Sequence, residues 1–303
     1  MINSIIENIK YINNFGILFS FKLYFFRRFV DYDKIHNLIL KKVEKEFNSV
    51  FINDLVDNKM VDKNLCNNKV WVLWWQGNKN MPPIVDLCIK NMYNVIKNKD
   101  IIFITKDNFQ KYVELPNYII NKFNRKQITM QTFSDIIRCY LLYYYGGTWI
   151  DSTVFMTKDL DKNIFNYDFY TIKRDINNSE FISNNKWTSF FLFAKRNNIL
   201  FKNVLNMYYN YWKKYNMTID YFLIDYFFYY LYSKNSFIKD MIDKIPINNT
   251  FVHGIYAAKP YNKKEIEKFM QNTYLYKLSW KDRIDYEDMK NNYNYLKRMS
   301  KIS

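Results

Sequence analysis

Residues 132–153, T-F-S-D-I-I-R-C-Y-L-L-Y-Y-Y-G-G-T-W-I-D-S-T, decide the fold of this chain because they predict a helix, a glycine turn and a buried strand in succession. Four apolar side chains recur at helical spacing: Phe133, Ile137, Leu141 and Tyr144. This spacing places them on one face of a helix. Gly146 and Gly147 supply the left-handed backbone that ends a helix, and the bulky residues after them are typical of a strand.

Two charged residues of this helix, Asp135 and Arg138, lie three positions apart and are therefore neighbours on its surface. On a helical wheel they lie well away from the apolar stripe, so they are available for a role other than core packing. The alternative is an exposed ion pair, which would contribute only about 0.2–0.5 kcal/mol. Ser134 or Thr132 can cap the start of the helix.

The strand after the glycines ends in polar side chains. Because side chains alternate along a strand, Asp151 and Thr153 are expected on one side and Ser152 on the other. We interpret the helix, the turn and this carboxylate as the spine of an enzyme active site.

A parallel sheet is predicted by the segment that precedes this spine. Residues 70–77, V-W-V-L-W-W-Q-G, form an apolar run that ends at glycine, a helix begins near Pro83, and residues 101–105 are a second apolar run. Strand, helix and strand within about 35 residues are the signature of a parallel sheet. Ligands bind such sheets beyond the carboxyl ends of the strands, where Trp75, Gln76 and Gly77 lie.

The rest of the chain predicts one α/β domain at residues 67–281, between a helical extension at residues 1–66 and a basic helix or tail at residues 282–303. After the spine we expect strands at 165–171 and 190–194, and helices at 200–215 and 220–232. Of the three tryptophans at positions 71, 74 and 75, at least one should lie in the core. Asp225, among aromatic residues, needs a buried partner.

Composition limits the classes of function. Among 303 residues, 49% are hydrophobic, which is ample for a core, and the formal net charge of +16 indicates an anionic partner or the coding bias of an AT-rich genome. Cys66, Cys88 and Cys139 lack the spacing of a zinc site, which favours reduced thiols in a cytosolic compartment. The chain has only two histidines and no glycine-rich phosphate loop, dinucleotide fingerprint or G-x-S-x-G elbow.

One apolar segment, residues 15–30, is interrupted by Lys22 and closed by Arg27 and Arg28, so it is too short and too charged to span a membrane. Two interpretations remain open. It can lie in a bilayer interface, or it can pack its aromatic side on the domain. It lacks the features of a secretory signal.

Several motifs in order resemble the capsular polysaccharide synthesis glycosyltransferases. They are W-V-L-W-W-Q-G, M-P-P-I-V-D-L-C-I, F-S-D-I-I-R followed by Y-G-G-T-W-I-D-S-T-V, and Y-K-L-S-W-K at residues 276–281. The resemblance extends to the wider group of DXD-containing sugar transferases, with the yeast initiating mannosyltransferase and the clostridial glucosylating toxins. It implies a GT-A type fold, a nucleotide-diphosphate sugar donor such as a UDP-sugar, Mn²⁺ or Mg²⁺, and transfer of a hexose with retention.

The resemblance also implies roles for individual residues. Asp135, Arg138 and Asp151 would be the catalytic residues, the first two bound to the donor sugar and the third to metal and ribose. The remaining residues expected to bind the donor are Trp74, Trp75, Gln76, Gly77, Gly147, Trp149 and Lys259. A flat indole suits a nucleotide base, and a carboxylate beside a guanidinium can recognise sugar hydroxyls.

The expected metal site departs from the family pattern. Many relatives have D-x-D here, whereas this chain has Asp151 and then Thr153, whose neutral hydroxyl is a weaker ligand. His253 is the candidate for a further ligand, because His253, Lys259 and Pro260 resemble a metal and diphosphate loop of another retaining transferase group. Lys281 and Lys259 are candidates to contact the diphosphate.

The acceptor expected from the resemblance is a glycan or a lipid-linked oligosaccharide at the inner face of a bacterial membrane, with peripheral contact to anionic lipid. Two other classes stay open: a non-catalytic sugar-nucleotide-binding relative, because of Thr153, and a basic nucleic-acid or membrane-surface binding protein. The basic residues are spread along the chain and no nucleic-acid motif is present, so nucleic acid is not the expected partner.

Overall fold

The structure is a computed structural model that describes residues 2–47 and 68–300. Its helices are α1 (Ile2–Phe15), α2 (Ile17–Arg28), α3 (Tyr32–Phe47), α4 (Pro83–Val95), α5 (Asn117–Asn124), α6 (Met130–Tyr144), α7 (Ile199–Lys214), α8 (Leu223–Lys234), α9 (Ser236–Asp243), α10 (Lys263–Asn272) and α11 (Asn292–Met299). Its strands are β1 (Lys69–Leu73), β2 (Asp100–Ile104), β3 (Gly147–Ile150), β4 (Val154–Met156), β5 (Phe169–Thr171), β6 (Phe191–Ala194) and β7 (Leu275–Lys277).

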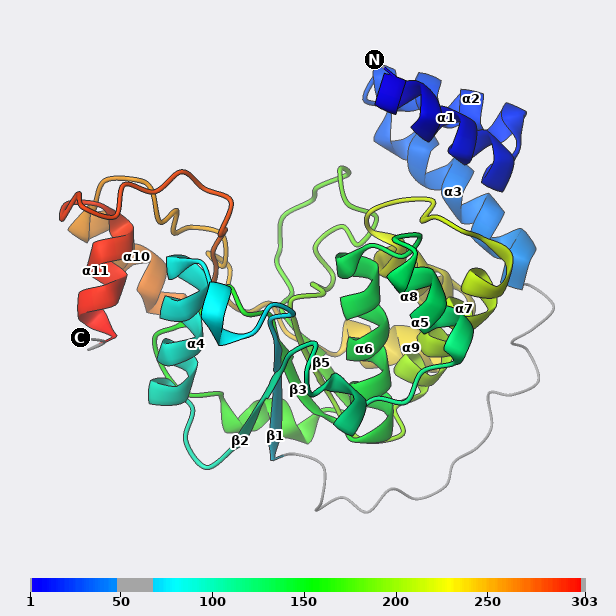
Figure 1. Ribbon diagram of the computed structural model, residues 1–303. Helices are drawn as coiled ribbons and strands as arrows, with labels where there is room; N and C mark the ends of the chain where they lie inside the picture. Colours follow the sequence, from blue (N-terminus) through cyan, green and yellow to red (C-terminus); the bar gives the residue numbers. More distant parts are fainter. Residues whose placement is uncertain (1, 48–67, 301–303) are drawn as a thin grey trace.

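A five-stranded sheet in the order β2-β1-β3-β6-β5 forms the centre of the molecule. β1 runs parallel to β2 and to β3, whereas β6 is antiparallel to both β3 and β5. The predicted parallel strand–helix–strand unit is therefore present, with α4 as its helix. Together with the helices at both ends of the chain (Figure 1), this sheet confirms the predicted α/β class.

The turn between α6 and β3 depends on glycine. Gly146 and Gly147 have φ values of +66° and +98°, a region that residues with a Cβ rarely adopt. A Cβ on Gly147 would lie 2.5 Å from the carbonyl oxygen of Lys69 on β1. The turn thus brings β3 directly against β1. The helix begins before both predicted caps, Thr132 and Ser134, because Thr129 is its N-cap and the Thr129 hydroxyl accepts from the amide of Thr132 at 3.2 Å.

α6 is buried on more than its apolar stripe, because it packs against α7 and α8 as well as β3. Asp135 and Arg138 are only 3% and 5% exposed. The interpretation as an exposed ion pair is therefore wrong. The helical wheel could not show this, because the helices that cover this face come from residues far along the chain.

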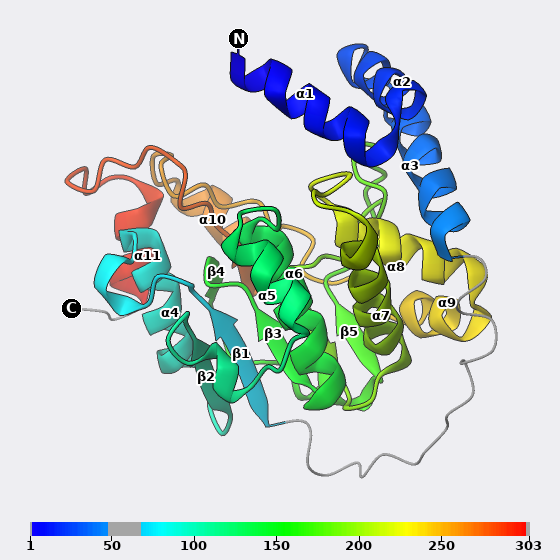
Figure 2. The ribbon, with the colours of Figure 1, turned by 45° about the vertical axis from the view of Figure 1, so that its right-hand side comes forward.

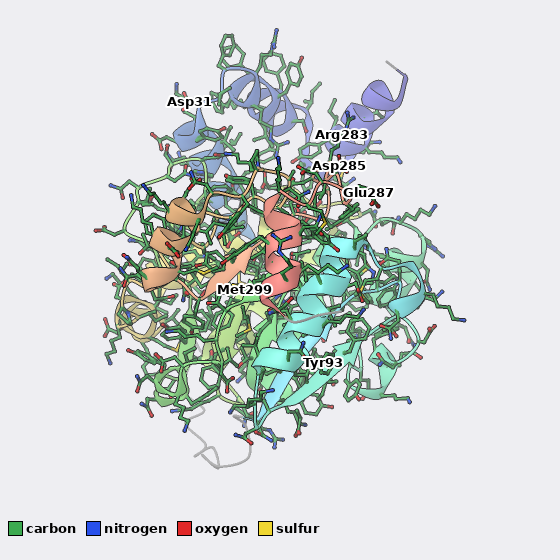
Figure 3. The ribbon with its side chains drawn as sticks, turned by 90° about the vertical axis from the view of Figure 1, so that its left-hand side faces the viewer. Asp31, Tyr93, Arg283, Asp285, Glu287 and Met299 are labelled. Carbon is green, nitrogen blue, oxygen red and sulfur yellow. The ribbon has the colours of Figure 1, made fainter. Side chains whose placement is uncertain are left out.

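Several predicted elements shift at their ends. The predicted strand 165–171 contains β5 only at its end, and a short 3₁₀ helix, Lys162–Asn166, precedes it. The predicted helix 220–232 begins at Leu223 as α8, and α9 and α10 were not predicted. In the tail, α11 lies beside α4 (Figure 3), and it buries Tyr293 and Leu296.

The three N-terminal helices form a layer of their own next to the domain, as Figures 1 and 2 show. α3 packs against α8, where Phe47 and Phe227 meet with ring centroids 5.6 Å apart. Arg27 of α2 forms an ion pair of 2.7 Å with Asp220. None of the helices within the described ranges has the length and apolar character needed to cross a bilayer.

The described cysteines, Cys88 and Cys139, are buried free thiols in the core, and Cys66 lies outside the described residues. The predicted boundary at residue 66 lies outside them as well.

Candidate active site

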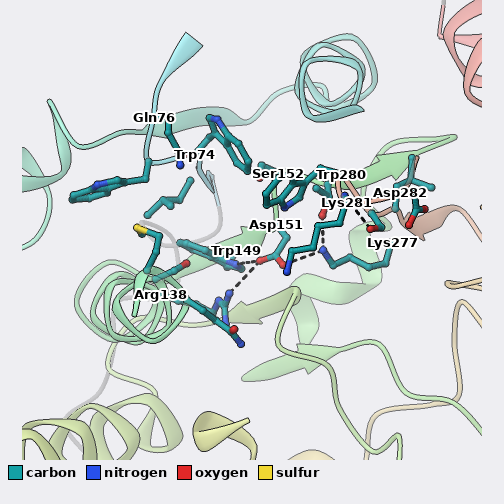
Figure 4. A pocket seen from close by; sticks show the side chains of 18 of the residues that line it. Trp74, Gln76, Arg138, Trp149, Asp151, Ser152, Lys277, Trp280, Lys281 and Asp282 are labelled. Carbon is teal, nitrogen blue, oxygen red and sulfur yellow. Dashed lines mark hydrogen bonds and ion pairs between the residues drawn. The ribbon is translucent and has the colours of Figure 1, made fainter. Parts of the chain in front are cut away.

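A pocket of about 760 Å³ opens where the parallel strands of the sheet end (Figure 4). Two segments that follow parallel strands contribute to it, residues 74–76 after β1 and residues 151–153 after β3. Others come from α6 and from the segment around β7. The charged lining residues are Arg138, Asp151, Lys277, Lys281 and Asp282, and the aromatic ones are Trp74, Trp75, Trp149, Tyr221, Tyr256 and Trp280.

The chain leaves the central sheet directly after β3. The amide of Asp151 still donates to the carbonyl of Phe190 at 2.9 Å, but Val154 then donates back to the carbonyl of Asp151 at 3.0 Å and closes a turn. The expectation that Ser152 points away from Asp151 and Thr153 is therefore wrong. All three residues line the pocket, because strand alternation does not apply within a turn.

A chain of charges links the buried helix to the pocket. One terminal nitrogen of Arg138 donates to Asp135 Oδ1 at 2.6 Å, and the other donates to Asp151 Oδ1 at 3.1 Å. The guanidinium carbon also lies 4.7 Å from the ring centroid of Trp149. Arg138 therefore has a carboxylate on each side and an indole beneath it, which fixes it at the pocket wall.

Asp151 forms more polar contacts than the other members of this chain of charges. Its Oδ1 also accepts from the indole N–H of Trp149 at 2.9 Å, and its Oδ2 lies 3.4 Å from Lys277 Nζ. Burial favours the neutral acid, but the cations of Lys277 and Arg138 outweigh it and hold the pKa of Asp151 below its usual value. Asp151 is thus an anion at neutral pH.

Lys277 reaches Asp151 because two short strands pair. β4 follows the turn after Asp151 and pairs antiparallel with β7, so that Val154 lies opposite Lys277. The amide of Leu278 donates to the carbonyl of Thr153 at 2.9 Å and extends this pairing into the turn. Lys277 Nζ donates in addition to the hydroxyl of Thr153. The ammonium group therefore contacts the side chains of both Asp151 and Thr153.

Two carboxyl groups outside the pocket lining, the buried Asp135 and the half-buried Asp225, have raised pKa values. Burial raises the pKa of Asp135 to about 7, although Arg138 opposes the shift. Burial likewise raises the pKa of Asp225 to about 6. The indole N–H of Trp187 donates to Asp225 at 2.8 Å and partly opposes this rise. Trp187 is the buried partner that Asp225 was expected to need.

The tryptophans at positions 71, 74 and 75 divide between core and pocket, as predicted. Trp71 is fully buried and donates to the carbonyl of Gly146 at 2.8 Å. Trp74 and Trp280 meet edge to face at the pocket, with ring centroids 5.8 Å apart. The indole nitrogen of Trp74 is buried and has no hydrogen-bond partner within the described part of the chain. It is a free donor beside the pocket.

Not every residue expected to bind the donor lines the pocket. Trp74, Trp75, Gln76, Arg138 and Trp149 do. Four expected residues are absent from the lining formed by the described residues: Gly77, Asp135, Gly147 and Lys259. Asp135 lies behind Arg138, and Gly147 lies at the opposite end of β3, against Lys69. The exposed Lys259 Nζ lies over the ring of Tyr256, 4.7 Å from its centroid.

The three expected metal ligands, Asp151, Thr153 and His253, all line the pocket, but they do not fit a divalent cation as they are arranged. They offer one carboxylate, and the ammonium of Lys277 contacts that carboxylate and the hydroxyl. Within residues 2–47 and 68–300, no group of three or more His, Cys, Asp or Glu side chains is close enough to hold a metal ion.

His253 stands on the pocket wall as an exposed residue. Its imidazole is nevertheless partly shielded from solvent by the surrounding protein. This burial lowers the pKa of His253 to about 4, and the nearby cations of Arg174 and Lys277 add to the shift. It is therefore neutral at pH 7.

Several other lining residues were given no role from the sequence, among them Lys277, Tyr221 and Trp280. Lys277 and Trp280 belong to the motif Y-K-L-S-W-K, so the sequence contained a signal for them. The motif did not reveal that Lys277 contacts the residues that follow β3. Tyr221 gave no signal, because a tyrosine in an aromatic segment is most simply a core residue.

The fold and the pocket define an α/β protein with a tryptophan-rimmed site that carries charged side chains beyond the carboxyl ends of its parallel strands. The model of one family, described as capsular polysaccharide synthesis protein, matches residues 23–299. The chain belongs to this family, and the resemblance seen in its motifs is confirmed.

The solved structure described as "PaToxG Glycosyltransferase" is similar over 82% of this chain and 94% of its own length, with 13% identity and a TM-score of 0.39. The search of curated proteins found no match to the chain.

Proposed function

We propose that this protein is a glycosyltransferase that moves a hexose from a nucleotide-diphosphate sugar to a glycan acceptor, with retention of configuration. One observation carries the proposal: the Asp135–Arg138–Asp151 chain of charges opens into a pocket rimmed by tryptophans at the end of a parallel sheet. Membership in the capsular polysaccharide synthesis family supports it.

The lining residues suggest how the donor binds. Trp74, Trp75 and Gln76 lie together beyond β1, where flat indoles can stack on a nucleotide base. Arg138 and Asp151 offer donors and an acceptor to sugar hydroxyls. Lys281 offers a positive charge to the diphosphate.

The transfer step then needs no covalent enzyme intermediate. The bond between the anomeric carbon and the diphosphate oxygen breaks, and its electron pair stays on the diphosphate. The acceptor hydroxyl oxygen forms the new bond on the same face of the sugar, and its proton passes to the departing diphosphate. Cations beside the diphosphate lower the barrier by stabilising the charge that develops there.

The acceptor that we propose is a lipid-linked oligosaccharide, reached from the cytoplasmic face of a membrane that this protein contacts peripherally. α2 exposes an apolar face with Ile17, Leu18, Phe21, Tyr24 and Phe25. Lys22 and Arg28 are exposed on the same helix. Apolar side chains flanked by cations match an anionic bilayer interface.

Activity on a panel of sugar nucleotides tests the proposal. We expect the purified chain to release nucleoside diphosphate from one donor, measured by coupled assay or chromatography. Asp151→Asn should lower this turnover by about 100-fold or more, because Arg138 and Lys277 lose the anion that positions them. Asp168→Asn is the matched control, because Asp168 pairs with Lys195 on the surface.

Unchanged turnover in Asp151→Asn would contradict the assigned site. Binding of sugar nucleotides without turnover of any donor, with or without a glycan acceptor, would instead identify a non-catalytic sugar-nucleotide-binding relative.

A further inference from the structure

The ammonium group of Lys277 occupies the position where a metal ion is expected from the D-x-D pattern. Lys277 Nζ lies 3.4 Å from Asp151 Oδ2 and donates to the hydroxyl of Thr153, the two positions of the D-x-D pattern. A single ammonium group thus contacts both side chains that would otherwise ligate a divalent cation.

The contacts of Asp151 leave little capacity for a metal. Its Oδ1 accepts from Arg138 and from the indole of Trp149, and Lys277 contacts its Oδ2. A divalent ion at this carboxylate would have to displace the lysine or lie beside it, and like charges at that distance repel. Thr153 cannot compensate, because its hydroxyl is neutral and magnesium and manganese prefer anionic oxygen.

Lys277 is also accessible to a ligand. Its side chain is 25% exposed and lines the pocket together with Lys281 and Arg138. Among the described residues, three cations therefore face the pocket, against the carboxylates of Asp151 and Asp282. The antiparallel pairing of β7 with β4 holds the backbone of Lys277 in place opposite Val154.

We propose that the ammonium of Lys277 takes the place of the divalent cation: it contacts the diphosphate of the donor and stabilises the nucleoside diphosphate as it departs. This inference rests on the proposed function, because it assumes a nucleotide-diphosphate sugar. Asp151 and Thr153 then orient Lys277 rather than a metal ion. A lysine in this role suits a site that needs charge at a fixed point.

Nucleotide binding to the purified full chain tests the inference. UDP and GDP are titrated by calorimetry in EDTA and again with Mn²⁺. We expect one of them to bind with the same affinity in both conditions. Lys277→Gln should weaken this binding about tenfold to a hundredfold, because a charge-assisted contact is lost. Lys277→Arg should retain most of it, and circular dichroism verifies that the variants fold.

A matched control and a rescue sharpen the result. Lys263→Gln removes an exposed lysine paired with Glu267 on α10, outside the pocket lining, and should leave affinity unchanged. The double variant Thr153→Asp/Lys277→Ala rebuilds two carboxylates without the ammonium. Its nucleotide affinity should become dependent on Mn²⁺, with a gain of about tenfold or more.

Wild-type binding that requires Mn²⁺ would overturn the inference and leave the proposed function standing. Full affinity in Lys277→Gln would also overturn it. Failure of both nucleotides to bind in either condition would overturn the proposed function and this inference with it.

Discussion

At the scale of single residues, this protein buries charges that compensate one another. Arg138 is 5% exposed and bonds to two carboxylates, so its burial is offset by Asp135 at 2.6 Å and Asp151 at 3.1 Å. Removing one member of such a set leaves an unpaired charge, at a cost of about 3–5 kcal/mol. The same residues thus serve stability and the pocket.

Asp225 gives a pH prediction of its own. Its pKa is about 6 in the folded protein and near 4 in the unfolded chain, about the ordinary value for aspartate. Between these pH values the unfolded chain has released its proton while the folded protein keeps it. The free energy of unfolding therefore falls as pH rises from about 4 to about 6.

Asp225→Asn should remove this contribution while keeping an acceptor for the indole of Trp187. Relative to wild type, the variant should gain roughly 1–2 kcal/mol of stability between pH 4.5 and 7, measured by urea unfolding. Asp168→Asn, on the surface, should run parallel to wild type. A parallel curve for Asp225→Asn would show that the carboxyl does not retain its proton.

At the scale of elements, the unit that builds the site is α6, its glycine turn and β3. The turn brings β3 against β1, so that Asp151 emerges beside the segment that carries Trp74. The pairing of β4 with β7 then adds Lys277. Each of these contacts depends on backbone geometry, which side-chain changes within the pocket should not alter.

Gly147→Ala tests this dependence. The new Cβ would lie 2.5 Å from the carbonyl oxygen of Lys69 at a φ of +98°, so we expect a loss of more than about 3 kcal/mol in urea unfolding. Gly77→Ala is the matched control. Its φ of +70° and ψ of −167° also favour glycine, but its Cβ would meet only Thr105 at 3.7 Å, so a smaller loss of about 1–3 kcal/mol is expected. Equal losses would show that strain alone, and not the close approach to β1, fixes Gly147.

At the scale of the whole molecule, the N-terminal helices lie away from the sheet (Figure 2), and α2 exposes apolar side chains to solvent. Ile17 is 71% exposed and Phe21 is 65% exposed on α2. Phe15 and Leu23 are buried instead, so these helices both pack on their neighbours and leave one face open. The two interpretations of residues 15–30 are therefore compatible, because each describes a different face.

Phe21→Glu/Phe25→Glu should weaken co-sedimentation with phosphatidylglycerol vesicles by about tenfold or more, because two aromatic side chains lose an apolar environment and gain negative charge. Raising the salt concentration should weaken the wild type as well. Phe237→Glu, an exposed phenylalanine on α9, is the control and should bind like wild type. If the wild type does not bind these vesicles, the membrane contact is wrong.

The sequence by itself determined the features that depend on local order along the chain. The period of Phe133, Ile137 and Leu141 determines α6, the glycines determine the turn, and the apolar runs of β1 and β2 around α4 determine the parallel unit. Because these signals lie within a few turns or strands, they place Trp74 and Asp151 at one edge of the sheet. Motif order also sufficed to indicate the family, which is confirmed.

Only the tertiary structure decided what surrounds those residues. Asp135 and Arg138 are buried because α7 and α8, more than 50 residues further along the chain, cover α6. Lys277 reaches Thr153 across 124 residues because β7 pairs with β4. Neither contact has a local period or spacing that reveals it, since burial and strand pairing depend on segments that meet only when the chain folds.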